Sequence, residues 1–329
     1  MKNKLKEFAN SFLRGNKAVL MVIVLMAAMV FLSPVFFTTR NLLNVLRQVC
    51  VSTILACGFT MILGSGSIDL SVGSLVGITG IFMAQMMVAG VHPALAIFFG
   101  ILIGACLGLV NAAFTVGFRL PPFIVTLAMQ QVLRGMCYLT TGMMPVTGLP
   151  KSFSNIGQGY LGPIPIPVFV MLGVVALVWL IVNRTRFGRY MLAMGGNIEA
   201  ARVSGINVTA MQFGVYASMG VCAAIAAVIL TARASSAQPT GGLNMEMDAI
   251  AAVVMGGTSM AGGSVNVVGA FFGCLVVGIV NNSLNLLGVD SNWQTVAKGA
   301  LILIAVILDS VSTSMYVNKR GGAKKKRAA

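Results

Sequence analysis

Residues 94–117 of the chain read ALAIFFGILIGACLGLVNAAFTVG and contain no charged side chain. At 1.5 Å rise per residue, an α-helix of this length is about 36 Å long. It could therefore cross the hydrocarbon core of a bilayer, which is about 30 Å thick. The rest of the chain is similar: hydrophobic residues make up 57% of its 329 positions, charged residues 9%, and the mean hydropathy is +0.93. A soluble domain carries about a quarter charged residues, so we expect an all-α polytopic membrane protein.

Apolar runs of helical length predict about ten transmembrane helices. Their ranges, bounded by Gly, Pro or charged residues, are 18–38, 42–63, 69–89, 94–117, 122–141, 166–183, 209–232, 248–260, 266–287 and 293–314. Three of these depart from a simple apolar span. The third contains Asp69, the fifth contains Arg134, and the eighth is too short to cross a bilayer alone.

The distribution of charge predicts the orientation of the chain, which has 22 Lys and Arg against 7 Asp and Glu. The basic residues gather at the N-terminus, in one central loop and at the C-terminus: Lys2, Lys4, Lys6, Arg14 and Lys17, then Arg184, Arg186, Arg189 and Arg202, then Lys319, Arg320, Lys324, Lys325, Lys326 and Arg327. This clustering follows the positive-inside rule and argues against a nucleic-acid partner. With an even number of spans, all three clusters lie on the cytoplasmic side of a bacterial inner membrane.

The predicted organisation is a basic cytoplasmic N-terminus (1–17), a single transmembrane domain (18–316) and a basic cytoplasmic tail (317–329). The cytoplasmic loop at 184–208 lies within the domain. In this topology the acidic residues Glu246, Asp248 and Asp290 fall outside. Four basic residues go against the rule and are expected near the membrane boundaries, where long side chains can reach the headgroups: Arg40, Arg47, Arg233 and Lys298.

Two polar stretches interrupt the apolar sequence, at 142–167 and 234–247. The first holds five prolines and five glycines, which predicts an irregular outer loop. The second leads into Glu246-Met247-Asp248-Ala249, which echoes Ser67-Ile68-Asp69-Leu70 at the start of the third span. If each Asp caps a short glycine-rich helix, the chain is an inverted five-plus-five repeat with short broken helices, as in many transporters.

The central loop contains the signals of a short capped helix. Asn197 suits the N-cap, Glu199 the first turn, Arg202 the last turn and Gly205 the left-handed C′ position. We expect a helix from Ile198 to Ser204, with Ala200 and Ala201 forming a small-residue face. The helix is either a contact surface for another protein or an ordinary capped loop, and the spacing alone does not separate these readings.

Residues that could support catalysis or bind a metal are almost absent. The chain has one histidine, His92, and no Gly-rich loop ending in Gly-Lys-Ser/Thr. The six cysteines lie in apolar stretches without the spacing of metal ligands. We expect no enzyme activity, no cofactor and no metal, so the energy for any transport must come from a partner or an ion gradient.

Several ordered blocks resemble the permeases of ATP-driven sugar importers, the family of ribose, xylose, arabinose and galactoside permeases. Residues 66–73, GSIDLSVG, match that family's GGIDLSVG with Ser67 in place of a glycine. The other blocks are PFIVTL at 122–127 with Arg134-Gly135, DAIAAVVMGGTS at 248–259 with Gly262-Gly263, and NLLGV at 285–289 with Lys298-Gly299. The chain departs from the pattern at Ser264-Val265-Asn266 and at Met245, which leaves the particular sugar open.

The resemblance implies a role for the central loop and a set of partners. The loop would contact an ATP-binding subunit on the cytoplasmic face, where ATP hydrolysis takes place. An extracytoplasmic sugar-binding protein and a second permease copy, identical or related, complete the assembly in the lipid bilayer. The coupling residues would be Arg186, Gly188, Arg189, Gly196, Asn197, Glu199, Ala200, Ala201, Arg202, Ser204 and Gly205.

A second set of polar residues lies within or beside the spans. It comprises Asp69, Ser71, Ser74, Thr79, Asn111, Arg134, Asp248 and Asn282. These residues either line a path for a polar solute or cap and join helices. The same features leave two other functions open, a permease for branched-chain amino acids or nucleosides and an ion-coupled secondary transporter. The secondary transporter needs carboxylates deep in the membrane, whereas Asp69, Asp248 and Asp309 fall near predicted span ends.

Overall fold

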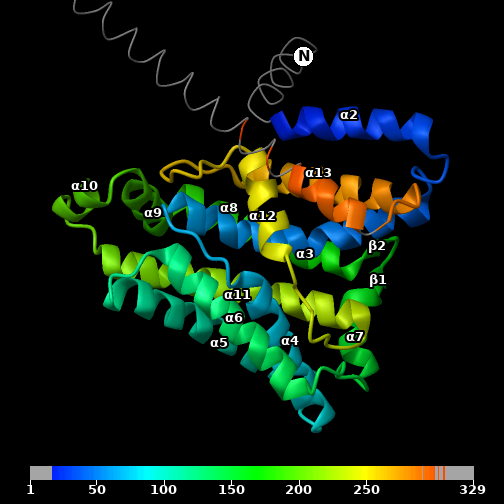
Figure 1. The fold of residues 1–329 in the computed structure, drawn as a ribbon, viewed down its shortest axis with the longest axis horizontal. Coiled ribbons are helices and arrows are strands. Elements are labelled where there is room, and N and C mark those ends of the chain that lie inside the picture. The colour runs from blue at the N-terminus through cyan, green and yellow to red at the C-terminus, as the bar shows by residue number, and fades with distance from the viewer. Residues whose placement is uncertain (1–16, 291, 301–302, 304–306, 308–329) are drawn as a thin grey trace, which may run out of the picture.

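The computed structural model describes residues 17–290, 292–300, 303 and 307, and its regular structure is almost entirely helical (Figure 1). The helices are α2 (Lys17–Leu32), α3 (Thr39–Gly64), α4 (Val72–Val88), α5 (Pro93–Ala112), the π-helix η1 (Ala113–Gly117), α6 (Pro122–Thr141), α7 (Lys151–Gln158), α8 (Ile166–Arg184), α9 (Arg186–Gly196), α10 (Ile198–Val203), α11 (Val208–Ala234), α12 (Met245–Met255) and α13 (Val267–Leu286). Within the described residues, β1 (Tyr160–Leu161) and β2 (Ile164–Pro165) form one antiparallel pair. The predicted helical class is confirmed.

Five helical segments in the described part of the chain are long and apolar enough to cross a membrane. They are Thr39–Gly64, Pro93–Gly117, Ile166–Arg184, Val208–Ala234 and Val267–Leu286. Two shorter apolar helices, Ala18–Leu32 and Val72–Val88, accompany them. Helix α12 has 11 residues, and the tenth predicted range lies partly outside the described residues.

Four sequence expectations need correction in detail. Helix α4 begins at Val72, three residues after Asp69. The first predicted span, 18–38, ends as a helix at Leu32. The 142–167 stretch is not irregular throughout, since it contains α7 and the β1–β2 pair. The central loop holds a second helix, α9, in addition to α10. Thr185 caps the N-terminus of α9, where its hydroxyl accepts a hydrogen bond from the Gly188 amide at 3.3 Å.

Helix α11 is the central element of the bundle, and it contacts α3, α4, α5 and α7 (Figure 1). Its closest partner is α5, where Gly100, Gly104 and Gly108 repeat every four residues. A Cβ atom at Gly104 would lie 2.6 Å from the carbonyl oxygen of Gly220, and a Cβ at Gly108 would overlap the carbonyl of Tyr216. Small residues at this spacing let two helix backbones meet, and the resulting van der Waals contact drives helix association in lipid.

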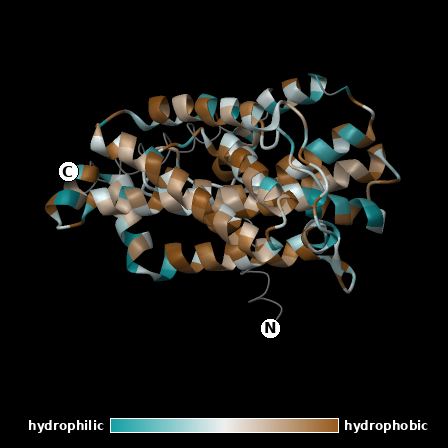
Figure 2. Ribbon diagram, turned by 90° about the horizontal axis from the view of Figure 1, so that it is seen from below, coloured by the Kyte–Doolittle hydropathy of each residue, from teal (hydrophilic) through white to brown (hydrophobic). Residues whose placement is uncertain are grey.

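The two ends of the bundle differ in content. Helices α9 and α10 lie at one end, and α7 with the β1–β2 pair lies at the opposite end (Figure 1). Hydrophobic residues cover the middle of the long helices, whereas hydrophilic residues concentrate toward both ends (Figure 2). This is the pattern expected of a chain whose middle lies in hydrocarbon and whose ends meet water.

Replacing Gly104 with alanine should destabilise the protein, because the added methyl group meets the Gly220 carbonyl and the Ala224 side chain. Overpacking of this kind lowers the free energy of unfolding by about 1–3 kcal/mol. Thermal unfolding of the purified protein in detergent measures the effect. Gly173→Ala in α8 is the matched control, since no atom lies within 4 Å of the new Cβ. Equal unfolding temperatures for the two variants would contradict the role given to the α5–α11 contact.

Candidate translocation site and coupling helices

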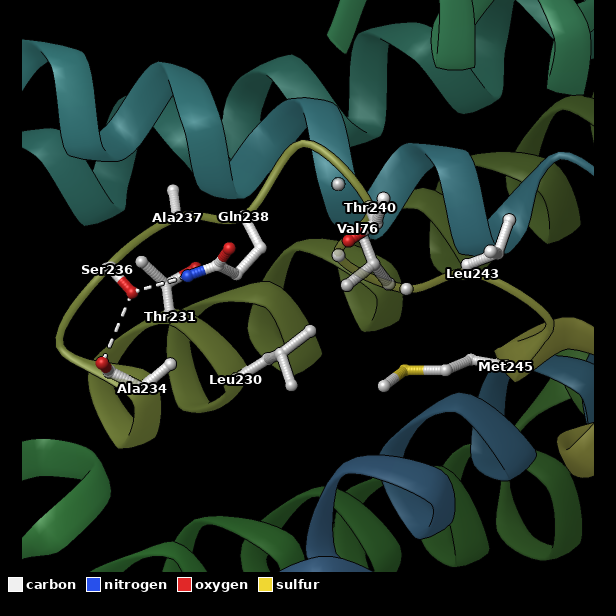
Figure 3. A pocket seen from close by; sticks show the side chains of 13 residues that line it. Val76, Leu230, Thr231, Ala234, Ser236, Ala237, Gln238, Thr240, Leu243 and Met245 are labelled. Atoms are coloured by element: carbon white, nitrogen blue, oxygen red, sulfur yellow. Dashed lines mark hydrogen bonds between the residues drawn. The ribbon is translucent and has the colours of Figure 1, made fainter. Parts of the chain in front are cut away.

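A cavity of about 240 Å³ lies between α4, α11 and the segment that joins α11 to α12 (Figure 3). The residues lining it are Val76, Gly77, Leu230, Thr231, Ala234, Ser236, Ala237, Gln238, Thr240, Gly241, Gly242, Leu243 and Met245. The amide of Gln238 donates to the Ser236 hydroxyl at 2.9 Å, and that hydroxyl donates to the Ala234 carbonyl at 3.2 Å. The lining side chains are apolar, hydroxyl-bearing or amide groups, and none of these described residues is charged.

Three of the predicted polar residues form a buried cluster at the start of α4. The Oδ1 atom of Asp69 accepts from the Ser71 amide at 2.9 Å and from its hydroxyl at 2.6 Å. The Asn111 amide of α5 donates to Ser71 Oγ at 2.8 Å and to Asp69 Oδ2 at 3.3 Å. Asp69 thus satisfies the amide of the residue before α4 and links α4 to α5. Among the described residues, no basic side chain forms an ion pair with it.

The other predicted path residues lie apart from this cluster. Thr79 is buried and donates to the Leu75 carbonyl of its own helix at 2.6 Å. Ser74 is buried and its hydroxyl has no hydrogen-bond partner. The amides of Asn282 and Asn41 exchange two hydrogen bonds at 2.9 and 3.0 Å, which tie α13 to α3.

Asp248 does not cap α12, contrary to the sequence expectation. Asn244 takes the N-cap position with a φ of 61°, while Asp248 lies in the first turn. Its carboxylate pairs with Lys298 Nζ at 3.1 Å. Such a pair gives Lys298 a partner within the protein, rather than the headgroup contact that the sequence suggested.

None of the eight predicted path residues lines the cavity. The cavity residues instead come from the 234–247 stretch and from α4 and α11, and the sequence signal for them was the polar composition of that stretch. Glu246, which the predicted topology places on the outer side of the membrane, is buried within the protein at 1% exposure and accepts a hydrogen bond from Gln130 of α6 at 2.8 Å. This partner lies 116 residues away in the chain, so local sequence could not indicate it.

Arg134 of α6 is buried and points its guanidinium at the same segment. Its Nη1 atom donates to the carbonyl oxygens of Pro239 and Gly241, each at 2.9 Å. A buried charged side chain is costly unless protein groups solvate it. Backbone carbonyls of the α11–α12 segment perform that task here.

Helix α10 has the capped geometry that the sequence predicts. Asn197 Oδ1 accepts from the Ala200 amide at 2.9 Å, Glu199 and Arg202 pair at 2.9 Å, and Gly205 follows the helix with a φ of 82°. The helix ends at Val203, with Ser204 as the C-cap. Ala201 is buried, so the expected two-alanine outer face is wrong: Ala200 is exposed together with the apolar side chains of Ile198 and Val203.

The neighbouring helix α9 connects α10 to the core through glycine contacts. A Cβ atom at Gly195 would overlap the Gly64 carbonyl at the end of α3 and would lie 2.8 Å from the Gly263 amide. That Gly263 amide donates to the Gly64 carbonyl at 3.0 Å. Gly188 packs equally closely on the Val182 carbonyl of α8. A displacement of α9 and α10 would therefore reach α3, α8 and the segment after α12 directly.

Comparison with known proteins identifies the family. The family described as "Branched-chain amino acid transport system / permease component" matches residues 41–306. The ribose import permease protein of Bacillus subtilis is 44% identical over 288 residues, which cover 87% of this chain and 89% of that protein. The ribose import permease protein of Escherichia coli K12 is 42% identical, covering 92% and 96% of the two chains. The chain belongs to this family of import permeases.

Other members of the family carry other sugars in their names. The galactose/methyl galactoside import permease protein of Escherichia coli K12 is 35% identical to this permease and covers 94% of it and 97% of its own length. No solved structure matches the permease. The expected family and its helical membrane fold are thus established for this chain by relatives that match it along most of its length.

Replacing Asp69 with alanine should destabilise the permease, because the Ser71 amide and the Asn111 side chain lose a buried acceptor. Each unsatisfied buried group costs about 1–3 kcal/mol. Thermal unfolding in detergent measures the loss, and Asp69→Asn provides the matched control because it keeps one acceptor oxygen for Ser71. A loss for Asp69→Asn as large as that for Asp69→Ala would contradict the hydrogen-bond role.

Proposed function

We propose that this permease is the membrane-spanning subunit of an ATP-driven importer that passes a monosaccharide, a ribose-like pentose or a related sugar, into the cell. The observation that carries the proposal is the 42–44% identity to two ribose import permeases over most of the chain. An extracytoplasmic binding protein delivers the sugar, and a separate ATP-binding subunit supplies the energy. Two permease copies, identical or related, complete the transmembrane path.

The chemistry of the cavity supports a sugar over an amino acid. Hydroxyl and amide groups of Thr231, Ser236, Gln238 and Thr240 can exchange hydrogen bonds with sugar hydroxyls. A zwitterionic amino acid would need charged partners for its carboxylate and ammonium groups, and the described cavity lining contains no charged side chain. The apolar walls formed by Leu230 and Leu243 suit the C–H faces of a sugar ring.

The proposed topology has ten transmembrane helices in two inverted halves, with both termini in the cytoplasm. The sequence of helices supports it. A long helix, a short helix and a glycine-containing 20-residue helix follow one another as α3, α4 and α5, and again as α11, α12 and α13. The halves also pack crosswise, since α5 and α4 contact α11, while α13 and α12 contact α3.

In this topology the α9–α10 end faces the cytoplasm and contacts the ATP-binding subunit. The exposed residues Ile198, Ala200 and Val203 offer that subunit a small apolar surface. The other coupling residues that the family resemblance implies would fix the position of this surface. Arg186 and Arg189 belong to α9, and Asn197, Gly205 and Ser204 bound α10.

Replacing Val203 with glutamate should uncouple the importer, because burying an unpaired carboxylate in a protein contact is costly. We expect binding-protein-stimulated ATP hydrolysis in reconstituted liposomes to fall by about tenfold or more, the factor that corresponds to about 1.4 kcal/mol. Thr209→Glu is the control: it adds the same charge in the first turn of α11, where an acidic residue suits the helix dipole. Full coupling in the Val203→Glu variant would refute the assignment of this surface.

Uptake of radiolabelled ribose by cells that carry the complete importer tests the transport class and the solute. Uptake should persist after the proton gradient is collapsed and stop when ATP is depleted. Excess unlabelled ribose should compete, whereas excess leucine should not. Loss of uptake with the proton gradient would indicate an ion-coupled transporter, and competition by leucine would indicate an amino-acid permease.

A further inference from the structure

The segment between α11 and α12 is held from one side by two side chains of α6. Arg134 donates to the carbonyls of Pro239 and Gly241, and Gln130 donates to the Glu246 carboxylate. Gln130 and Arg134 are four residues apart, so they lie on the same face of the helix. Helix α6 therefore holds the middle of the segment and the first turn of α12, which follows it. Because Arg134 contacts backbone oxygens, it fixes the path of the main chain whatever side chains the segment carries.

The glycine face of α4 supports the same segment from another side. A Cβ atom at Gly77 would lie 2.8 Å from the Gly241 carbonyl and 3.2 Å from Arg134 Nη1. A Cβ at Gly73 would overlap both the Gly242 carbonyl and Glu246 Oε2. The segment thus rests directly on the backbone of α4. Gly242 has a φ of 77°, a left-handed conformation that glycine adopts without steric cost.

The side of the segment that is left free forms a wall of the cavity. Gln238, Thr240, Leu243 and Met245 all line it, and Figure 3 shows them around the same cavity as Val76 of α4 and Leu230 and Thr231 of α11. Hydrogen bonds from charged donors contribute more to stability than neutral ones. The charged donor here is Arg134 of α6, a helix that does not line the cavity itself. The position of the wall therefore depends on α6.

We propose that Arg134, Gln130 and Glu246 form a latch that holds residues 238–246 in place as the movable wall of the solute cavity. The three are positioning residues, since they act on the solute only through this wall. Movement of α6 relative to α4 during the transport cycle would release the segment and change access to the cavity. The inference rests on the proposed function for the identity of the solute, but the latch itself does not depend on it.

Thiol labelling of a cysteine in the wall tests the latch. The full-length permease carries Met245→Cys, at a partly buried position that lines the cavity, together with Cys106→Ser, because the other five native cysteines are buried. In membrane vesicles, Arg134→Met should raise the labelling rate of the residue-245 thiol by about tenfold, the change in an opening equilibrium that corresponds to about 1.4 kcal/mol. Arg134→Lys, which keeps a charged donor, should restore part of the slow rate. In the Glu246→Gln variant, which keeps an acceptor oxygen for Gln130, the wall thiol should be labelled slowly.

The buried native Cys274 of α13, outside the segment, is the control. General loosening of the fold would raise the labelling rates of both thiols, whereas release of the latch raises only that at 245. If Arg134→Met does not insert or fold, Gln130→Ala supplies the same comparison with the loss of one hydrogen bond. Unchanged labelling at 245 in the folded variants, or equal increases at 245 and at Cys274, would overturn the proposal.

Protection by solute separates the latch from the proposed function. Ribose should slow labelling at 245 when Arg134 is present and should have little effect in Arg134→Met. If ribose gives no protection in either protein while Arg134→Met still labels faster, the latch stands and the assignment of ribose fails. If ribose protects both proteins equally and their labelling rates agree, the solute assignment stands and the latch is refuted.

Discussion

The structure depends on the close approach of helix backbones at glycine residues. In lipid, apolar side chains gain nothing by leaving solvent, so helices associate through van der Waals contact and buried hydrogen bonds. Gly104 and Gly108 of α5 meet the backbone of α11, and Gly73 and Gly77 of α4 meet the segment after α11. These contacts fix α11 between α4 and α5. They leave beside α11 the small cavity that we propose receives the solute.

The same constraint governs the polar groups inside the bundle. A buried amide, hydroxyl or charge must find its partner within the protein, because hydrocarbon offers none. Asp69 accepts from Ser71 and Asn111, and the two amides of Asn41 and Asn282 satisfy each other. Most of the polar residues within the spans therefore join helices. The cavity takes its polar groups from an irregular segment, where side chains and backbone are free to face a solute.

Transport requires that the two ends of the bundle communicate. At one end, the glycines of α9 bring its backbone into direct contact with the ends of α3 and α8 and with the segment near Gly263. At the middle, α6 holds the cavity wall through hydrogen bonds to its backbone. Tightly packed contacts transmit displacement, since close-packed interiors are hardly compressible. A small movement of α10 can in this way change the position of elements that surround the cavity.

Composition indicated the membrane class and the helical fold, local capping signals indicated the helix that begins after Asn197, and ordered motifs indicated the permease family. None of these signals requires knowledge of which distant residues meet, and those contacts follow only from the fold. Local sequence indicated a polar stretch at 234–247 that leads into Glu246, but not what either of them contacts. The fold buries Glu246 against Gln130 and makes that stretch a cavity wall. The physical reason is that these partners belong to α6 and α4, whose approach is set by helix packing and leaves no signal in the residues nearby.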